Sequence, residues 1–338
     1  MSALTVKSRR VVFLAAALII TAWGTVGFYQ GLHRGFSGGL YDPQYVVPGV
    51  MPGGLAEKSG FQAGDRVISV EGRPVEDLGM ESRWPRSLAP MIGQPQRFVV
   101  ERKGERIPID VVYGPPSRDA VNNRIGAALF GLSFLWLGLW ALFTTRTSPA
   151  LTLAHNGLAA GAAMSLGLGP NLGSWNGVQG HISMAFTVLM CILLLRFFVT
   201  FPRTKRVSES RLAAWAIYGA WGCLLAFLVL ELIVHPVLYY TTGSVAYPLM
   251  LVYGVLILVA ITHSVVKTPH AELRDSGMNL ILGGLLASIL AIVSALSSGS
   301  NVPGWIYSLA TVPIPLAMVL AVRKQYRFRE ANATGHAG

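Results

Sequence analysis

The sequence predicts a multi-pass α-helical membrane protein with about eight transmembrane helices and one small, mostly β domain inserted after the first of them. Of the 338 residues, 52% are hydrophobic and only 13% are charged, and the mean hydropathy is +0.51. Several apolar runs are long enough to cross a bilayer, whereas residues 30–122 have the mixed composition of a water-exposed domain. Soluble proteins of this length do not combine these properties.

Eight apolar stretches account for the predicted helices. Crossing about 30 Å of hydrocarbon at about 1.5 Å per residue takes roughly 20 apolar residues. Windows of that length fit at residues 11–29, 125–144, 149–169, 181–201, 212–234, 246–266, 278–298 and 304–322. The Gly- and Ala-rich third stretch predicts a helix at the centre of the bundle, and Pro313 and Pro315 predict a bend in the last helix.

The basic residues indicate the orientation. With a cytoplasmic N-terminus, the three short outer loops carry no Lys or Arg, and the inner segments carry Lys7, Arg9, Arg10, Arg146, Arg203, Lys205, Arg206, Arg211, Lys267, Arg274, Arg323, Lys324, Arg327 and Arg329. This distribution follows the positive-inside rule, from which long translocated domains are exempt. It explains the net charge of +11 without a nucleic-acid partner.

We therefore expect a multi-pass protein of the inner (plasma) membrane in four parts. They are a cytoplasmic N-terminus with the first helix (1–29), an extracytoplasmic domain (30–122), a seven-helix bundle (123–322) and a basic cytoplasmic tail (323–338). A cleaved signal peptide is the alternative for the first segment, and it would leave the next domain on the same side.

Turn signals divide the inserted domain into short elements. Tyr45-Val-Val47 can pair as a strand, Leu55–Ser59 can form a short helix ended by Gly60, and Arg66–Val70 can form a strand between two turns. The composition also predicts a helix near Met80–Met91. The pattern is that of a small mixed domain dominated by β-structure.

A hairpin completes the domain. Two alternating runs, Arg97–Glu101 and Ile107–Val112, flank Lys103-Gly104. We expect Ala56 and Phe61 to bury the short helix, and Ile68 and Val70 to point one face of the strand Arg66–Val70 inward. We also expect Asp65 to accept hydrogen bonds from turn amides.

The run Val50-Met-Pro-Gly-Gly-Leu-Ala-Glu-Lys-Ser-Gly-Phe-Gln-Ala-Gly-Asp-Arg-Val-Ile-Ser-Val-Glu-Gly-Arg-Pro-Val75 resembles the core signature of bacterial PDZ domains. The resemblance implies a PDZ-like fold over residues 38–116 that adds an extended peptide, often a C-terminus, to a sheet edge. It also implies that a glycine-containing loop holds the peptide carboxylate, and Gly38, Gly39, Leu40 and Tyr41 occupy that place. Because prolines follow this loop and proline removes ladder donors, a domain that serves only as a spacer is the alternative.

The predicted helices lack the groups that an intramembrane protease needs. A zinc protease of the membrane uses His-Glu-x-x-His on one helix, and the nearest match, Glu231-Leu-Ile-Val-His235, has a single His followed by Pro236. Ser297-Ser-Gly-Ser300 has no later intramembrane His to act as its base. We therefore expect a protein without enzymatic activity, cofactor or metal.

Polar residues at membrane depth form a second set of candidate site residues. Glu231, His235, His155 and Arg196 could line an intramembrane polar site, in which Glu231 could pair with His235. The alternatives are an interhelical hydrogen bond for His155 and its neighbour Asn156, and contact with lipid phosphate for Arg196.

A second resemblance covers the helical block. Leu195-Arg-Phe-Phe-Val-Thr-Phe-Pro-Arg203 at one helix exit, and Arg323-Lys-Gln-Tyr-Arg-Phe328 at another, look like the membrane input modules of bacterial sensor histidine kinases of the competence-pheromone type. Those proteins join a first helix, a PDZ-like domain and several further helices. This sequence carries no kinase after its last predicted helix.

The expected function is that of a non-enzymatic membrane sensor or adaptor. It would bind a peptide or a protein C-terminus through the outer PDZ-like domain and signal through the helices to a separate cytoplasmic kinase, with anionic lipid at its basic inner loops. One alternative is an accessory subunit that presents substrates to a membrane protease. Another is a small-molecule transporter or membrane enzyme with a site between the helices.

Overall fold

The computed structural model divides the chain into two compact units, which are described separately. The helical unit comprises Met1–Gly24, Asn122–Gly167 and His181–Gly338, and the second unit comprises Thr25–Val121 and Leu168–Gly180. The structure describes residues 6–34, 45–50, 54–78, 91–116, 118–145, 147–172, 176–203, 210, 218–219, 221–226, 229–230, 239–297, 306 and 309–335.

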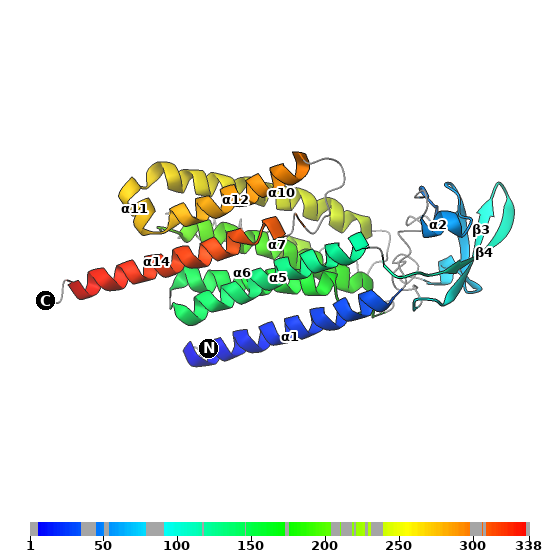
Figure 1. Cartoon of the computed structure of the whole chain (residues 1–338), viewed down its shortest axis with the longest axis horizontal. Coiled ribbons are helices and arrows are strands. Elements are labelled where there is room, and N and C mark those ends of the chain that lie inside the picture. The colour runs from blue at the N-terminus through cyan, green and yellow to red at the C-terminus, as the bar shows by residue number, and fades with distance from the viewer. Residues whose placement is uncertain are drawn as a thin grey trace. The chain divides into compact units, whose positions relative to one another are not determined.

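Long helices lie side by side in the helical unit (Figure 1). They are α1 (Val6–His33), α5 (Arg118–Thr144), α6 (Ser148–Gly167), α7 (Asn176–Thr200), α10 (Tyr239–Lys267), α12 (Met278–Ser297) and α14 (Pro313–Gly335), with the short α11 (His270–Asp275) between α10 and α12. These helices cover the predicted spans except 212–234, which is described only in short helical pieces, and the first half of 304–322, since α14 begins at Pro313.

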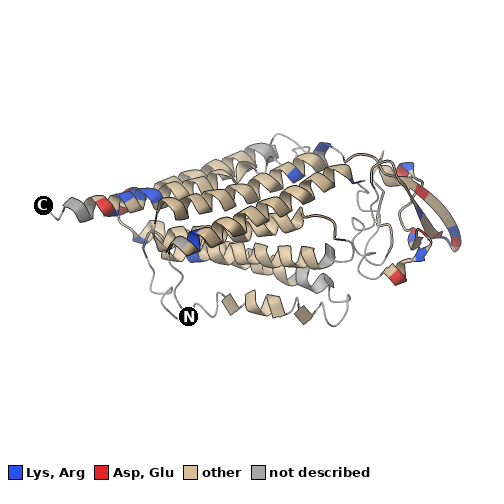
Figure 2. Cartoon of the chain, turned by 90° about the horizontal axis from the view of Figure 1, so that it is seen from below, with Lys and Arg blue, Asp and Glu red and all other residues tan. Residues whose placement is uncertain are grey.

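Four of the described helices are long and apolar enough to span a membrane. They are Ser8–His33, Ala120–Thr144, Val178–Thr200 and Val245–Lys267, and a shorter apolar helix covers Met278–Val293. Figure 2 shows that the middle of the helices is almost free of Lys, Arg, Asp and Glu. The chain is thus a helical membrane protein, as its composition predicts.

Helix α6 packs at the centre, because small residues let its backbone approach α5. A Cβ atom on Gly157 would lie 2.4 Å from the Phe134 carbonyl oxygen, and one on Gly138 would lie 2.6 Å from the Leu153 carbonyl oxygen. Separations this short exclude a side chain, so these glycines determine how closely α5 and α6 approach. The Gly- and Ala-rich composition of this helix predicted its central position correctly.

The last helix differs from its prediction. Instead of bending at its prolines, the chain turns at Thr311 and Val312, and α14 begins at Pro313. Proline fits the first turn of a helix because the amide it lacks would have no intrahelical acceptor there. Helix α14 then continues to Gly335, so the predicted basic tail is helical over most of its length.

The second unit contains a four-stranded antiparallel sheet in the order β2-β1-β3-β4. Its elements are α2 (Leu55–Lys58), β1 (Arg66–Val70), β2 (Arg73–Pro74), the 3₁₀ helix η1 (Val75–Leu78), β3 (Pro95–Arg102) and β4 (Glu105–Val112). The predicted hairpin is present: Lys103 and Gly104 have φ angles of 53° and 86° and connect β3 to β4. Two positive φ angles in a two-residue loop match the twist of the strands it joins.

A hydrophobic core lies on one face of this sheet. Its fully buried members are Val47, Phe61, Val67, Val70, Val75, Leu78, Phe98, Val100, Ile109, Val111 and Tyr113. The prediction that Ile68 faces inward is wrong, because the pairing of β1 with β3 shifts register between Val67 and Ser69. This irregularity turns Val67 into the core and leaves Ile68 half-buried.

Candidate peptide-binding domain and the polar residues of the helices

Asp65 organises the turn that precedes β1. Its side chain is only 1% exposed, and its Oδ2 accepts a hydrogen bond from the Gln62 amide at 2.8 Å. Arg102, at the end of β3, donates to both carboxylate oxygens at 2.7 Å and to the Gly60 carbonyl at 2.7 Å. This two-pronged ion pair ties the turn after α2 to the far end of the hairpin.

The electrostatics of Asp65 follow from these contacts. Burial raises the pKa of the carboxyl, but the hydrogen bonds from Arg102 and Gln62 and the positive charge of Arg102 outweigh burial, so the pKa lies below its ordinary value. The turn-amide bond was predicted from the sequence, whereas Arg102 was not. The signal for Arg102 was only its place one residue before the hairpin turn.

Residues 45–47 form the segment expected to border a peptide groove. Val46 pairs with Arg66 in an isolated bridge, the Val47 amide donates to the Asp65 carbonyl at 2.8 Å, and the Val67 amide donates to the Tyr45 carbonyl at 2.7 Å. The segment therefore runs antiparallel to the start of β1, on the side opposite β3. The predicted Tyr45–Val47 strand is present as this short pairing.

The proposed carboxylate loop itself is not tested. Gly38, Gly39, Leu40 and Tyr41 lie outside the described residues, as does the helix predicted near residues 80–91 except for its last residue. What the structure gives is the framework on which such a groove is built: a buried core, an ordered turn at Asp65 and the pairing of residues 45–47.

Both chain connections of this domain meet at one turn. The Ile92 amide donates to the carbonyl of His33, the last residue of α1, at 3.4 Å, and the Gly93 amide donates to the Tyr113 carbonyl at 2.9 Å. The Tyr113 hydroxyl donates to Gln96 at 2.7 Å. The end of α1 and the exit of the domain are therefore held by the same short segment.

Of the four intramembrane candidates, only His155 and Arg196 lie within the described residues, so the predicted polar site as a whole stays a prediction. His155 has an exposed ring whose Nδ1–H donates to the Leu151 carbonyl, 2.8 Å away on its own helix, and the ring meets Phe13 of α1 edge-on. The interhelical hydrogen bond comes instead from Asn156, which donates to the Met190 carbonyl at 2.7 Å. The interhelical hydrogen bond is thus confirmed for Asn156, whereas the described hydrogen bond of His155 lies within its own helix.

Arg196 has a partner within the protein, and its predicted contact with lipid phosphate is not tested. Its guanidinium donates to the Tyr218 hydroxyl at 2.7 Å and lies over the same ring at 5.8 Å. Glu231 and His235 lie outside the described residues, so this pair stays a prediction. Over the part of the chain that the structure describes, no three His, Cys, Asp or Glu side chains are placed to hold a metal ion.

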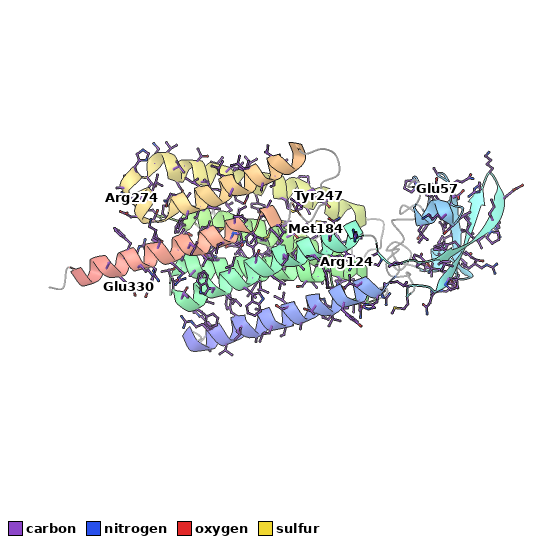
Figure 3. All side chains as sticks on the ribbon, viewed as in Figure 1. Glu57, Arg124, Met184, Tyr247, Arg274 and Glu330 are labelled. Atoms are coloured by element: carbon purple, nitrogen blue, oxygen red, sulfur yellow. The ribbon has the colours of Figure 1, made fainter. Side chains whose placement is uncertain are left out.

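Two sequence motifs that are distant along the chain contact each other at one end of the helices. The Gln325 side-chain amide of α14 is buried and donates to the Pro202 carbonyl, just beyond α7, at 2.7 Å. Next to it, Lys324 donates to the Arg274 carbonyl at 2.5 Å, and Arg203 pairs with Glu272. Figure 3 shows Arg274 at this end of the helical unit and Tyr247 at the other.

The fold and these sites define a helical membrane protein that carries a PDZ-like domain. Residues 46–82 match the PDZ domain family. Two curated proteins named "Putative zinc metalloprotease", from Brucella suis and Brucella melitensis, are each 31% identical over 94 residues. The match covers 28% of this chain and 24% of each relative, so the chain spans about a quarter of their length. No solved structure matches.

Proposed function

We propose that this protein is a non-enzymatic accessory of a membrane protease, whose PDZ-like domain holds extended segments of other proteins for that enzyme. The observation that carries the proposal is a PDZ domain on an apolar multi-helix chain whose sequence has no His-Glu-x-x-His. The partial similarity to proteins named as zinc metalloproteases supports a protease context. The zinc-binding helix would then belong to a partner.

The chemistry of the domain suits this role. PDZ domains add a peptide as an extra strand, with main-chain hydrogen bonds providing affinity and side-chain pockets providing selectivity. Such recognition needs a rigid sheet, and here the buried core and the Asp65–Arg102 pair brace the strands next to residues 45–47. The loop that would hold the peptide carboxylate is Gly38–Tyr41.

The proposed side of the membrane follows from the charges. Contacts join Arg10 and Arg323 to the C-terminal end of α5, and Arg203 and Arg274 to α11 and α14. We propose that this end of the helical unit faces the cytoplasm, in accord with the positive-inside rule. The PDZ-like domain joins the opposite ends of α1 and α5. We therefore assign it to the extracytoplasmic face of the inner (plasma) membrane.

Peptide titration tests the binding step. Purified full-length protein in detergent is titrated with fluorescent peptides that end in a free carboxylate, and with the same peptides as C-terminal amides. We expect the carboxylates to bind more tightly, Leu40→Ser to weaken binding, and Val112→Ser, a matched change at an exposed position of β4, to leave it unchanged. Equal or absent binding of both peptide forms would contradict the proposal.

Crosslinking tests the partner. Photo-crosslinkers placed at exposed Glu57 on α2, in native membranes, should capture a membrane protease that contains the zinc motif. A protease partner is contradicted if the crosslinker at Glu57 captures only other proteins, at the same level as a matched crosslinker at Val112. The peptide titration would still test peptide binding in that case.

A sensor or adaptor with a cytoplasmic partner is the second candidate. It is favoured by α14, which continues as a helix to Gly335 beyond the Gln325–Pro202 contact. A protein that reads this helix should be lost from co-purification when the chain is truncated after Phe328. Unchanged co-purification would remove this candidate.

A further inference from the structure

Two arginines from opposite ends of the chain reach the same helix terminus. Arg10 of α1 donates to the carbonyls of Leu142 and Phe143, both at 3.3 Å, in the last turn of α5. Its guanidinium lies over the Phe143 ring at 5.4 Å. Arg323 of α14 lies over the Trp140 ring at 4.4 Å. The last turn of α5 thus carries two cationic groups, each against an aromatic face.

Within the described residues, no carboxylate balances the charge of these two arginines. Other basic residues at this end have carboxylate partners: Arg203 pairs with Glu272, and Arg274 lies near Asp275. Over the described residues, neither Arg10 nor Arg323 forms an ion pair. The Nε–H of Arg10 is also buried without an acceptor within the described part of the chain. An external anion would satisfy both the charge and the donor.

The C-terminal end of α5 orients Arg10 but uses only one nitrogen of its guanidinium. The partial negative charge at the C-terminal end of α5 attracts the guanidinium of Arg10 and orders it there. One nitrogen of that guanidinium makes both carbonyl contacts, so its other N–H groups remain for a ligand. The guanidinium of Arg323 lies over the Trp140 ring, and its five N–H groups can donate to an oxygen ligand.

The surroundings indicate a lipid as the source of the anion. Trp140 and Phe143 are 36% and 42% exposed, so the aromatic rings are on the outer surface of the helical unit. Exposed apolar side chains continue from them into the membrane span at helical spacing: Trp136 precedes Trp140 on α5, Leu316 and Leu320 precede Arg323 on α14, and Leu14 and Leu18 follow Arg10 on α1. Each arginine therefore lies at the end of an apolar track that an acyl chain can follow.

We propose that Arg10 and Arg323 bind the phosphate of an anionic phospholipid against Trp140 and Phe143, at the end of α5. A guanidinium binds phosphate oxygens in a planar, two-pronged geometry, and the aromatic rings lie where Trp favours the headgroup level. The site is independent of the peptide-binding role proposed above. The anionic lipid expected at basic inner loops is here assigned to specific residues.

Lipid titration of the purified full chain in detergent tests this site. Short-chain phosphatidylglycerol, short-chain phosphatidylcholine and inorganic phosphate are titrated, and binding is followed by native mass spectrometry. We expect phosphatidylglycerol to bind most tightly. Because a basic residue near an anionic surface contributes about 1 kcal/mol, or roughly fivefold, Arg323→Gln and Arg10→Ala should each weaken phosphatidylglycerol binding by about fivefold.

Matched variants test whether lipid binding depends on this site. Arg329→Gln removes the same charge from an exposed position further along α14 and should change affinity less than twofold. Trp140→Leu should weaken binding without changing the charge. If Arg10→Ala does not yield folded protein, Arg323→Gln alone decides.

Three results would overturn the proposal. They are equal affinity for the two lipids, an Arg329→Gln effect as large as that of Arg323→Gln, and tight binding of inorganic phosphate without preference for the lipid. The second result would mean a diffuse basic surface, and the third a site for free phosphate.

Discussion

Replacing Phe98 by alanine tests whether the PDZ-like domain is held by its own core. Phe98 is 2% exposed in the middle of β3, and its ring meets Phe61 edge-on at 5.5 Å. Removing a buried phenylalanine side chain costs about 3–5 kcal/mol of folding free energy, which includes the cavity left behind. A domain of roughly 70 residues has a total stability of about 3–10 kcal/mol. Phe98→Ala should therefore remove a large part of it.

The assay is hydrogen exchange of the full chain in detergent, followed by mass spectrometry. A loss of about 3–5 kcal/mol lowers amide protection in β1 and β3 by roughly two to three and a half powers of ten. Protection of the helical unit should not change, because the domain belongs to the other compact unit. Val112→Ala, an exposed position on β4, is the control. Unchanged protection of β3 in Phe98→Ala, or an equal loss in the control, would refute the reasoning.

Three further predictions concern single contacts. Because the folded-state pKa of Asp65 is lowered, its stabilising contribution is complete above its unfolded-state pKa of about 3.9 and disappears as the pH falls through the lower folded-state pKa. Asp65→Asn should therefore flatten the acid dependence of amide protection, once protection is corrected for the intrinsic exchange rate. Gly157→Ala places a Cβ against a backbone carbonyl and should lower the thermal stability in detergent, whereas Gly254→Ala, which meets no atom within 4 Å, should not. Gln325→Leu leaves a buried carbonyl without its donor, which should cost about 1–3 kcal/mol and increase exchange at the start of the exposed part of α14.

Local chemistry made the hairpin and the turn before β1 predictable. Lys103-Gly104 between alternating runs specifies a two-residue loop, because only its geometry matches the strand twist. The Asp65 side chain lies close to the amides it can bind, so its bond to Gln62 followed from spacing. Arg102 is 37 residues from Asp65, and its partner depends on how β3 pairs with β1. Strand register of this kind is a tertiary property that alternation alone does not determine.

The errors have the same physical origin. Ile68 was assigned to the core by strict alternation, and the irregular register at Val67 shifted the pattern by one residue. His155 and Asn156 are adjacent polar residues on one helix, and only the side that each faces decides which one reaches α7. That side depends on the contact of α6 with its neighbours, which composition does not report.

The orientation of the chain is the premise on which both proposals depend, and it is testable with two labelled positions. Glu57 on α2 and Glu330 on α14 are exposed and are not part of the predicted spans (Figure 3). The native thiols, Cys191 and Cys223, both lie in helical segments and serve as the background in the unsubstituted chain. Glu57→Cys should react with a membrane-impermeant maleimide in cells whose inner membrane is intact, and Glu330→Cys should react only after lysis. The physical reason is that moving the basic residues of the short loops to the outer face opposes the positive-inside bias. The reverse labelling would place the PDZ-like domain in the cytoplasm, where it could not meet extracytoplasmic peptides, and would move the Arg10 and Arg323 site away from the anionic cytoplasmic leaflet.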